Sequence, residues 1–263
     1  MTSPAHVPAV RMPHGGAIPL VGFGTWQLRG RRATEAVRTA LDAGYRHLDT
    51  ATMYANEDEV GQAIADSGLD RGGLFITTKI RSSDSRRVRA VLSQSLRSLR
   101  TDYLDLWLVH WPPSGASARR QLWAELLEVR AEGLAREVGV SNFSLRQIDE
   151  LIEASGEAPA VNQIDWGPTF YDARVLAGHA ERRIALEGYS PLKNTNLDDP
   201  VLAKIAAAHG TTTAQVVLRW HVEHAIVVIP KSAKPDRIRS NFDLFGFSLT
   251  ADEVASIDAL GRG

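Results

Sequence analysis

The sequence predicts a single (β/α)8 barrel, the TIM-barrel fold of the α/β class, with a short N-terminal β-hairpin. Apolar runs that suit β-strands recur eight times, and most are followed by a segment with the periodicity of an amphipathic helix. No linker rich in proline, glycine or serine and no shift in composition divides the 263 residues. These features indicate a parallel barrel that forms one domain, residues 1–263, and a doubly wound open sheet is the alternative.

The expected strands are the eight apolar runs themselves. Each is four to seven residues long, which is too short for a typical helix. They lie at residues 20–24, 45–48, 74–79, 104–110, 135–140, 160–164, 184–187 and 226–229. The first 16 residues are expected to form a hairpin, in the string VPAVRMPHGGAIPLV. It should cover the bottom of the barrel after turning at His14, Gly15 and Gly16.

Helices are predicted from apolar stripes and end signals. The segment after the first strand carries such a stripe, and Gly44 follows it where a left-handed C-cap belongs. A second helix is expected over residues 121–132, just before a glycine. Asp199 and Pro200 supply an N-cap and a first-turn proline for a helix that ends before Gly210. A further helix carries the stripe Ala214, Val217, Leu218 and His221.

Composition excludes several classes of protein. Thirty basic and 31 acidic side chains leave a net charge of −1, so we expect no nucleic-acid partner. The absence of cysteine removes disulfides, thiolate metal sites and thiol nucleophiles, and it fits a reducing compartment. The N-terminus lacks the features of a signal peptide, and no apolar run approaches the roughly 18 residues of a membrane helix. We therefore expect a cytoplasmic protein.

Polar side chains follow seven of the eight expected strands. The carboxyl ends of barrel strands meet at one mouth, where barrels carry their functional groups. Any one of these residues is readily explained as a helix cap or a loop residue, but seven in register favour a site. They are Asp49, Lys79, His110, Ser141, Asn142, Asn162, Gln163, Tyr189, Ser190, Lys231 and Ser232.

The sequence uses lysine sparingly, with five lysines among its 30 cations, so each lysine calls for a reason. Lys79 ends the apolar run FITTKI, where a buried ammonium needs an anionic partner. Asp49, one strand away, can be that partner. Tyr54 follows on the same loop as Asp49, and a nearby ammonium would lower its pKa from the ordinary value near 10. His110 could donate a hydrogen bond to a substrate oxygen.

Several segments resemble the aldo-keto reductases, and most closely their bacterial diketo-gluconate reductase-like group. The match runs from about residue 8 to 260 through GFGTWQ, LDTATMYANEDEVG, FITTKI, DLWLVHWP, VGVSNF, PAVNQ, GYSPL and IPKS. The resemblance implies that a nicotinamide cofactor delivers a hydride to a carbonyl carbon while Tyr54 protonates the oxygen. It further implies that Lys79 lowers the pKa of Tyr54, that Asp49 keeps Lys79 charged, and that His110 orients the carbonyl group.

Cofactor contacts follow from the same resemblance. Ser141, Asn142 and Gln163 would hold the carboxamide, and Tyr189 would stack on the nicotinamide ring. The other expected contacts are Gly24, Thr25, Asp49, Ser190 and Leu192. After the last strand, a cationic group suited to a 2′-phosphate favours NADP(H), and it comprises Lys231, Ser232, Arg237 and Asn241. Ser240 stands where the family usually has a glutamate. A Rossmann site is rejected, because GFGTWQ lacks the third glycine of its fingerprint.

The substrate is expected to be a small carbonyl compound in an aromatic pocket. Trp26, Trp111 and Phe143 lie next to motif residues, so they should form a wall beside Tyr54 and His110. The loop PPSGASA is short, and the chain ends at Gly263 without the longer tail of its relatives, which predicts an open pocket with broad selectivity. We expect a monomer.

Four other interpretations are weighed against this one. A regulatory barrel that binds the cofactor without turnover would be free to lose any of the four catalytic residues, and all four are present. An isomerase barrel would need a carboxylate base at the mouth, and none is obvious. His221 and His224 lack a third metal ligand, so no metal is expected. A cluster of cations could bind a phosphate, but it is more simply explained as the solvent-exposed start of a helix. It comprises Arg81, Arg86, Arg87 and Arg89.

Overall fold

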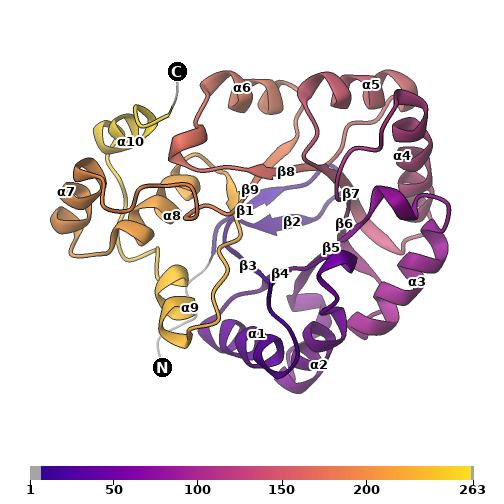
Figure 1. Ribbon diagram of the computed structural model, residues 1–263, viewed down its shortest axis with the longest axis horizontal. Coiled ribbons are helices and arrows are strands. Elements are labelled where there is room, and N and C mark those ends of the chain that lie inside the picture. Colours follow the sequence, from indigo (N-terminus) through magenta and orange to yellow (C-terminus); the bar gives the residue numbers. More distant parts are fainter. Residues whose placement is uncertain (1–6, 262–263) are drawn as a thin grey trace.

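A computed structural model describes residues 7–261, and its centre is a parallel β-barrel (Figure 1). Eight strands are hydrogen-bonded in the order β10-β9-β8-β7-β6-β5-β4-β3. A bridge between Val21 and Val228 brings the two edges together, and Val228 N donates to Leu20 O at 2.8 Å. The predicted barrel is therefore confirmed, and the open doubly wound sheet is wrong.

All eight predicted strands are present, and their bounds differ from the expected ones by at most two residues. They are β3 (Gly22–Gly24), β4 (His47–Asp49), β5 (Phe75–Ile80), β6 (Leu104–Val109), β7 (Ala135–Ser141), β8 (Val161–Asp165), β9 (Ala185–Tyr189) and β10 (Val227–Val228). Because every pair in the barrel is parallel, all the carboxyl ends meet at one mouth.

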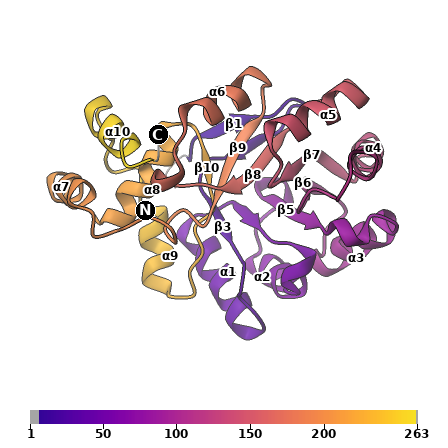
Figure 2. The ribbon, with the colours of Figure 1, turned by 45° about the horizontal axis from the view of Figure 1, so that its top comes forward.

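The helices cover the outside of the barrel. In Figure 1, α1 to α6 follow one another around it, α8 and α9 continue the ring, and Figures 1 and 2 both place α7 and α10 outside α8. Their bounds are α1 (Arg31–Ala43), α2 (Glu57–Ser67), α3 (Val88–Leu99), α4 (Ala116–Ala131), α5 (Leu145–Ser155), α6 (Ala173–Glu181), α7 (Pro200–His209), α8 (Thr213–Glu223), α9 (Pro235–Phe242) and α10 (Ala251–Asp258). Within residues 7–261, no helix is long and apolar enough to cross a membrane.

The predicted helix ends agree with the structure in two cases and differ in one. Gly44 adopts the left-handed conformation after α1, with φ of 111°. The Asp199 side chain accepts a hydrogen bond from Val201 N at 2.8 Å at the start of α7. Helix α4 begins at Ala116, earlier than the expected residue 121, because its first turn has no large apolar side chain and so adds nothing to the apolar stripe.

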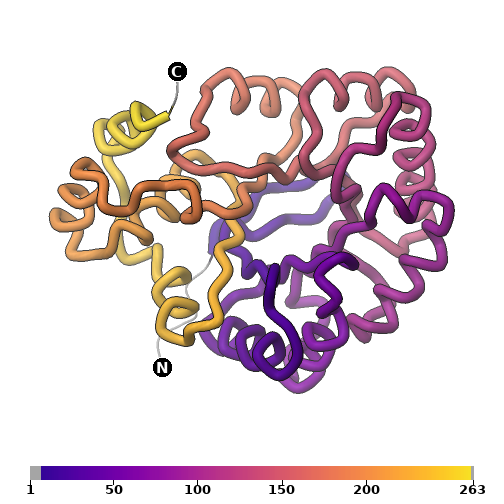
Figure 3. The backbone as a smooth tube through the Cα atoms, viewed as in Figure 1, coloured from indigo at the N-terminus to yellow at the C-terminus, as the bar shows by residue number. Residues whose placement is uncertain are grey.

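The N-terminal hairpin lies across the centre of the ring in the backbone view of Figure 3. Strands β1 (Ala9–Arg11) and β2 (Ala17–Pro19) pair antiparallel around a turn in which Met12 N donates to Gly16 O at 2.8 Å. Met12 and Ile18 are buried in the main core. The hairpin therefore closes the bottom of the barrel as predicted, and the part of the prediction that concerns residues 1–6 lies outside the described residues.

Helices α2 and α3 approach each other closely at Gly61. A Cβ atom there would lie 2.1 Å from Ser98 O and 2.8 Å from Leu99 Cα. We expect Gly61→Ala to lower the free energy of unfolding by about 1–3 kcal/mol, since the clash with backbone outweighs the better helix propensity of alanine, about 1 kcal/mol. Urea denaturation measures the change. Gly73→Ala is the control, because nothing lies within 4 Å of its Cβ position, and equal effects at the two sites would contradict the prediction.

Candidate active site

A cavity of about 680 Å³ opens at the carboxyl ends of the strands. Most of the predicted site residues line it, although they come from seven different strands and their following loops. They are Gly24, Trp26, Asp49, Tyr54, His110, Trp111, Ser141, Asn142, Gln163, Tyr189, Ser190, Leu192 and Lys231. The barrel thus brings together groups that are up to 207 residues apart in the chain, from Gly24 to Lys231.

Lys79 and Asp49 form an ion pair behind this cavity. Lys79, on β5, is fully buried, and its Nζ donates to both carboxylate oxygens of Asp49 at 2.6 and 2.7 Å. The third Nζ hydrogen bond goes to Thr50 O at 2.9 Å. Burial alone would lower the pKa of Lys79, but the Asp49 carboxylate raises it, and the net direction is upward. Lys79 therefore keeps its positive charge inside the barrel.

Tyr54 ends a short 3-10 turn, Thr52–Tyr54, that follows β4. Lys79 Nζ lies 5.2 Å from the centre of its ring, and Thr52 Oγ1 ties the turn to Lys79 O at 3.0 Å. Burial raises the pKa of Tyr54, Lys79 opposes that rise, and the net direction is upward. This net direction differs from the lowered pKa expected from the sequence, because partial burial of the phenol outweighs the effect of one ammonium.

His110 follows β6 and faces Tyr54. The two ring centres are 5.6 Å apart with the planes at 78°, an edge-to-face contact. Burial, and then the charges of Lys79 and Arg81, lower the pKa of His110 to about 3. The imidazole is therefore neutral at physiological pH and carries one N–H that can donate to an oxygen atom.

Side-chain amides and hydroxyls at the ends of β7, β8 and β9 form a hydrogen-bond network in the wall of the cavity. Tyr189 OH donates to Asn142 Oδ1 at 2.8 Å, and Asn142 Nδ2 donates to His110 O at 3.0 Å. Ser141 Oγ donates to Gln163 O at 2.9 Å. Gln163 Nε2 donates to Asp49 Oδ2 at 2.8 Å, so this network is joined directly to the Lys79 ion pair.

Three of the seven described non-glycine residues with positive φ lie at the mouth of the cavity. Asn142 has φ of 64°, Gln27 of 63° and Ser190 of 55°, all in the left-handed region that residues other than glycine rarely adopt. All three line the cavity. Such conformations persist only where the surrounding structure holds them, and they are common at functional sites.

The remaining predicted residues lie outside the cavity lining. Thr25 is fully buried, and its Oγ1 donates to Asp49 O at 2.9 Å. Phe143 is packed into the core, so the expectation that it forms part of the aromatic wall is wrong. Ser232 accepts a hydrogen bond from Lys234 N at 3.1 Å at the start of α9, and Arg237 and the buried Asn241 follow on that helix.

The cations near α9 are available to an anion. Lys231 and Arg237 are exposed, and within residues 7–261 neither side chain has an acidic partner within ion-pair distance. Arg239 on the same helix is different, because its Nη1 lies 3.6 Å from Asp236 Oδ1. Lys231 also lines the cavity, so a ligand held there can extend toward α9.

Several lining residues were not predicted to belong to the site. Most of them enter from loops whose course the apolar pattern leaves open, whereas Asp165 ends β8 and Ile229 ends the expected strand 226–229. They are Gln27, Met53, Asp165, Pro191, Lys193, Ile229 and Pro230. Lys193 carried a usable signal, because lysine is rare in this chain, and its Nζ lies 5.7 Å from the centre of the Trp26 ring.

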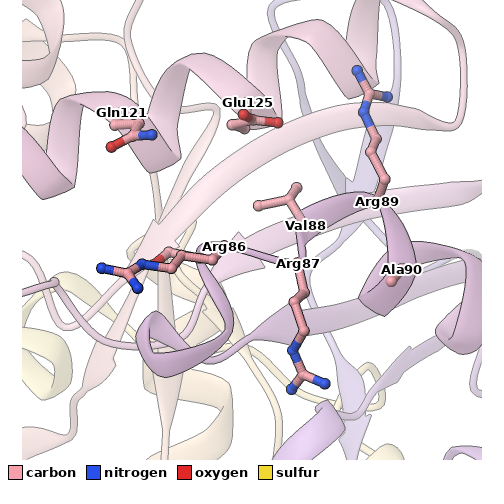
Figure 4. Close-up of a pocket in the computed structure, with 8 residues that line it drawn as sticks. Arg86, Arg87, Val88, Arg89, Ala90, Gln121 and Glu125 are labelled. Atoms are coloured by element: carbon pink, nitrogen blue, oxygen red, sulfur yellow. The ribbon is translucent and has the colours of Figure 1, made fainter.

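A second hollow, of about 610 Å³, lies where α3 begins beside α4 (Figure 4). The arginine side chains around it point in different directions in that view. Arg87 Nη2 donates to Asp84 Oδ1 at 2.6 Å, and Arg89 pairs with Glu128 and Glu132. These cations therefore do not converge on one anion, and the arrangement is that of a solvated helix start.

The two histidines considered as metal ligands have separate partners. His221 Nδ1 is 2.8 Å from Val217 O, and His224 Nε2 is 2.8 Å from Asp258 Oδ1. The described part of the chain contains no group of three or more histidine, aspartate or glutamate side chains placed to hold a metal ion.

The fold and the site define a TIM-barrel protein with its ionisable groups at the carboxyl ends of the strands. The chain belongs to the aldo/keto reductase family, whose model matches residues 20–262. It is 42% identical to an aldo-keto reductase of Mycolicibacterium vanbaalenii, with 100% of this chain and 95% of that protein covered. The resemblance to this family expected from the sequence motifs is therefore confirmed.

A second relative and a crystal structure are also similar to this chain over almost its whole length. The chain is 37% identical to the methylglyoxal reductase DkgA of Escherichia coli, over 98% of this chain and 95% of that protein. The crystal structure of an aldo/keto reductase from Brucella melitensis superposes with a TM-score of 0.93 at 42% identity, over 97% of this chain and 99% of that one. The protein is accordingly a member of an oxidoreductase family that acts on carbonyl compounds.

Proposed function

We propose that the protein reduces aldehydes and ketones to alcohols with NADPH, and that Tyr54 is the general acid. One observation carries the proposal: the buried Lys79 ammonium is held by Asp49 within 5.2 Å of the Tyr54 ring, at the wall of the cavity. A phenol is a weak acid at neutral pH, and a fixed ammonium beside it stabilises the phenolate that forms when its proton leaves. A buried ion pair adds little net stability compared with apolar packing, so a role in the reaction accounts better for the charged pair at this position.

In the proposed reaction, Tyr54 supplies the proton and His110 orients the carbonyl group. The bound nicotinamide supplies a hydride, which forms the new C–H bond at the carbonyl carbon. Tyr54 gives its hydroxyl proton to the carbonyl oxygen, and the neutral His110 donates a hydrogen bond to the same oxygen. Their rings, 5.6 Å apart, leave that oxygen in reach of both side chains. Lys79 stays protonated throughout, because the Asp49 carboxylate holds it.

The polar residues at the ends of β7, β8 and β9 fit the cofactor. A carboxamide needs both hydrogen-bond donors and acceptors, and the side chains of Ser141, Asn142 and Gln163 supply both. Tyr189 offers an aromatic face to the nicotinamide ring. Gly24 also lines the cavity, although its lack of a side chain serves the protein's own packing, since a Cβ atom there would lie 2.8 Å from Ile229 O. Lys231 and Arg237 would hold the 2′-phosphate. All these residues belong to one chain, so we infer that a monomer, a single barrel domain, suffices for activity.

We propose small carbonyl compounds as substrates. Trp26 and Trp111 are 44% and 51% exposed at the mouth, so they offer apolar contact without enclosing a ligand. A site of this kind discriminates weakly between related molecules, because each additional apolar contact contributes only about 1–3 kcal/mol. Methylglyoxal, the substrate in the name of the E. coli relative, belongs in the first set of compounds to be tested.

NADPH absorbance at successive carbonyl concentrations tests the proposal. Methylglyoxal, simple aromatic aldehydes and sugar-derived carbonyl compounds should be reduced, with one NADPH consumed for each alcohol formed. NADPH that binds, as measured by fluorescence titration, but is not consumed with any compound of this panel would indicate a binding protein without turnover.

NADPH should bind more tightly than NADH. Charge-assisted hydrogen bonds from Lys231 or Arg237 to the 2′-phosphate contribute about 1.5–3 kcal/mol each, or about ten- to 150-fold in affinity. The preference should fall as ionic strength rises. Fluorescence titration measures it, with Arg237→Gln as the test variant and Arg239→Gln, on the same helix but paired with Asp236, as the control. Equal affinities of the wild-type protein for both cofactors would contradict the prediction.

A further inference from the structure

A carboxyl group with no part in the proposed reaction lies inside the barrel. Glu187, on β9, is fully buried, and neither of its carboxylate oxygens has a hydrogen-bond partner among the described residues. It is paired in register with Gln163 on β8, which lines the cavity. An ionised carboxylate without a partner is very costly in such a place, whereas the protonated acid is not.

No cation among the described residues forms a direct ion pair with Glu187. Lys79 has three N–H bonds, and all three are directed to Asp49 and Thr50. His47, on β4, places its Nε2 3.7 Å from Glu187 Oε1. Burial, and then the charge of Lys79, lower the pKa of His47 to about 3, so it is uncharged, and its Nε2 is also 3.1 Å from Thr77 Oγ1.

The remaining neighbours give no cation either. Gln163 directs its Nε2 to Asp49 Oδ2 at 2.8 Å, and although this amide lowers the pKa of Glu187, it is neutral and brings no positive charge. Val227, the register partner of Glu187 on β10, is apolar. Tyr54 is uncharged until it loses its proton. The interior would thus hold two anions and one cation if Glu187 were ionised, and it is electrically balanced when Glu187 is neutral.

We propose that Glu187 is a positioning residue of the reaction, a buried acid that keeps its proton at neutral pH and so leaves Asp49 as the single anion beside Lys79. The inference rests on the proposed function. Its consequence is electrostatic, because a negative charge on Glu187 raises the pKa of both Tyr54 and Lys79. The neutral acid therefore keeps Tyr54 a stronger proton donor than an ionised Glu187 would.

The proposal includes a pH at which this balance changes. Burial, and then the nearby Asp49 carboxylate, raise the pKa of Glu187 to about 8, and the opposing effects of the Gln163 amide and the Lys79 charge are smaller. Below that pH Glu187 is neutral. Above it Glu187 gains a charge, Tyr54 holds its proton more tightly, and the phenolate appears only at a still higher pH.

Infrared difference spectra test the protonation state directly. Subtracting Glu187→Gln from the wild-type protein at pH 7 should reveal the C=O stretch of one protonated carboxyl group, and in the wild type this band should disappear as the pH rises through about 8. Glu137→Gln is the matched control, because Glu137 is equally buried but accepts two hydrogen bonds from His14, both at 2.8 Å. If the substitution Glu187→Gln removes carboxylate bands and not the acid band, Glu187 is ionised at pH 7 in the wild type, and the proposal is overturned. Glu187→Leu gives the same readout if the glutamine variant does not fold.

Kinetics then test the effect on Tyr54. In the direction of alcohol oxidation Tyr54 must be ionised to accept a proton, and in the wild type it ionises after Glu187 has become negative. Glu187→Gln should therefore lower the midpoint of the kcat/KM pH profile for oxidation by about 1 pH unit, and Glu137→Gln should leave it unchanged. A purely structural role would alter rates at every pH and leave the midpoint in place, and that result would overturn the proposal.

The two proposals fail in different ways. A wild-type protein that never turns over NADP(H) contradicts the proposed function. Normal wild-type turnover with an unchanged midpoint in Glu187→Gln contradicts only the role of Glu187.

Discussion

Tyr54→Phe is expected to lower kcat for carbonyl reduction at least about 100-fold while leaving the affinity for NADPH nearly unchanged. The substitution removes the hydroxyl proton and keeps the ring that packs against His110. General acid catalysis contributes about 10²–10⁴-fold to a rate, which sets the expected range. Stopped-flow single turnovers measure the chemical step, and fluorescence titration measures cofactor binding.

The matched control for this variant is Tyr103→Phe. Tyr103 stacks against Arg71 and Arg136 and does not line the cavity, so its hydroxyl has no part in the chemistry. A Tyr54→Phe protein that keeps more than a tenth of wild-type turnover on a good substrate would show that another group supplies the proton.

Lys79→Met is expected to affect stability as well as catalysis. It leaves the Asp49 carboxylate buried without its cation, and breaking a buried ion pair in this way costs about 3–5 kcal/mol. It also removes the charge that stabilises the Tyr54 phenolate, so kcat should fall by about the same factor as in Tyr54→Phe. Urea denaturation and single-turnover kinetics measure the two effects separately.

A double variant separates the two effects of Lys79. Asp49→Asn together with Lys79→Met removes both charges, so most of the stability should return while reduction stays slow. Arg31→Met is the surface control, because Arg31 and Glu35 are 90% and 57% exposed and such a pair contributes little. Recovery of activity in the double variant would contradict the role given to Lys79.

Much of this architecture is local and was predictable from the sequence. Strand positions follow from short apolar runs, and the ends of α1 and α7 follow from Gly44, Asp199 and Pro200, because capping depends on residues within one turn. The placement of Asp49 beside Lys79 was predictable for a related reason. In a parallel barrel, residues at the ends of neighbouring strands must meet, so topology alone brings them together.

Other features depend on how distant segments pack. The apolar pattern does not show that Thr25 and Phe143 are turned away from the cavity, or that the arginines near α3 diverge. The net rise in the pKa of Tyr54 reflects how much protein covers the phenol, which sequence spacing does not reveal.

For Glu187, the sequence determined the secondary structure, and the tertiary structure alone decided the electrostatic environment. In the string ALEGY, the sequence determines that Glu187 belongs to a strand, because a short apolar run specifies extended backbone locally. Only the closed barrel shows that this side chain meets His47 from a strand 140 residues earlier and finds no cation there. The physical reason is that secondary structure depends on neighbours in the chain, whereas the cost of a charge depends on every group that surrounds it in space.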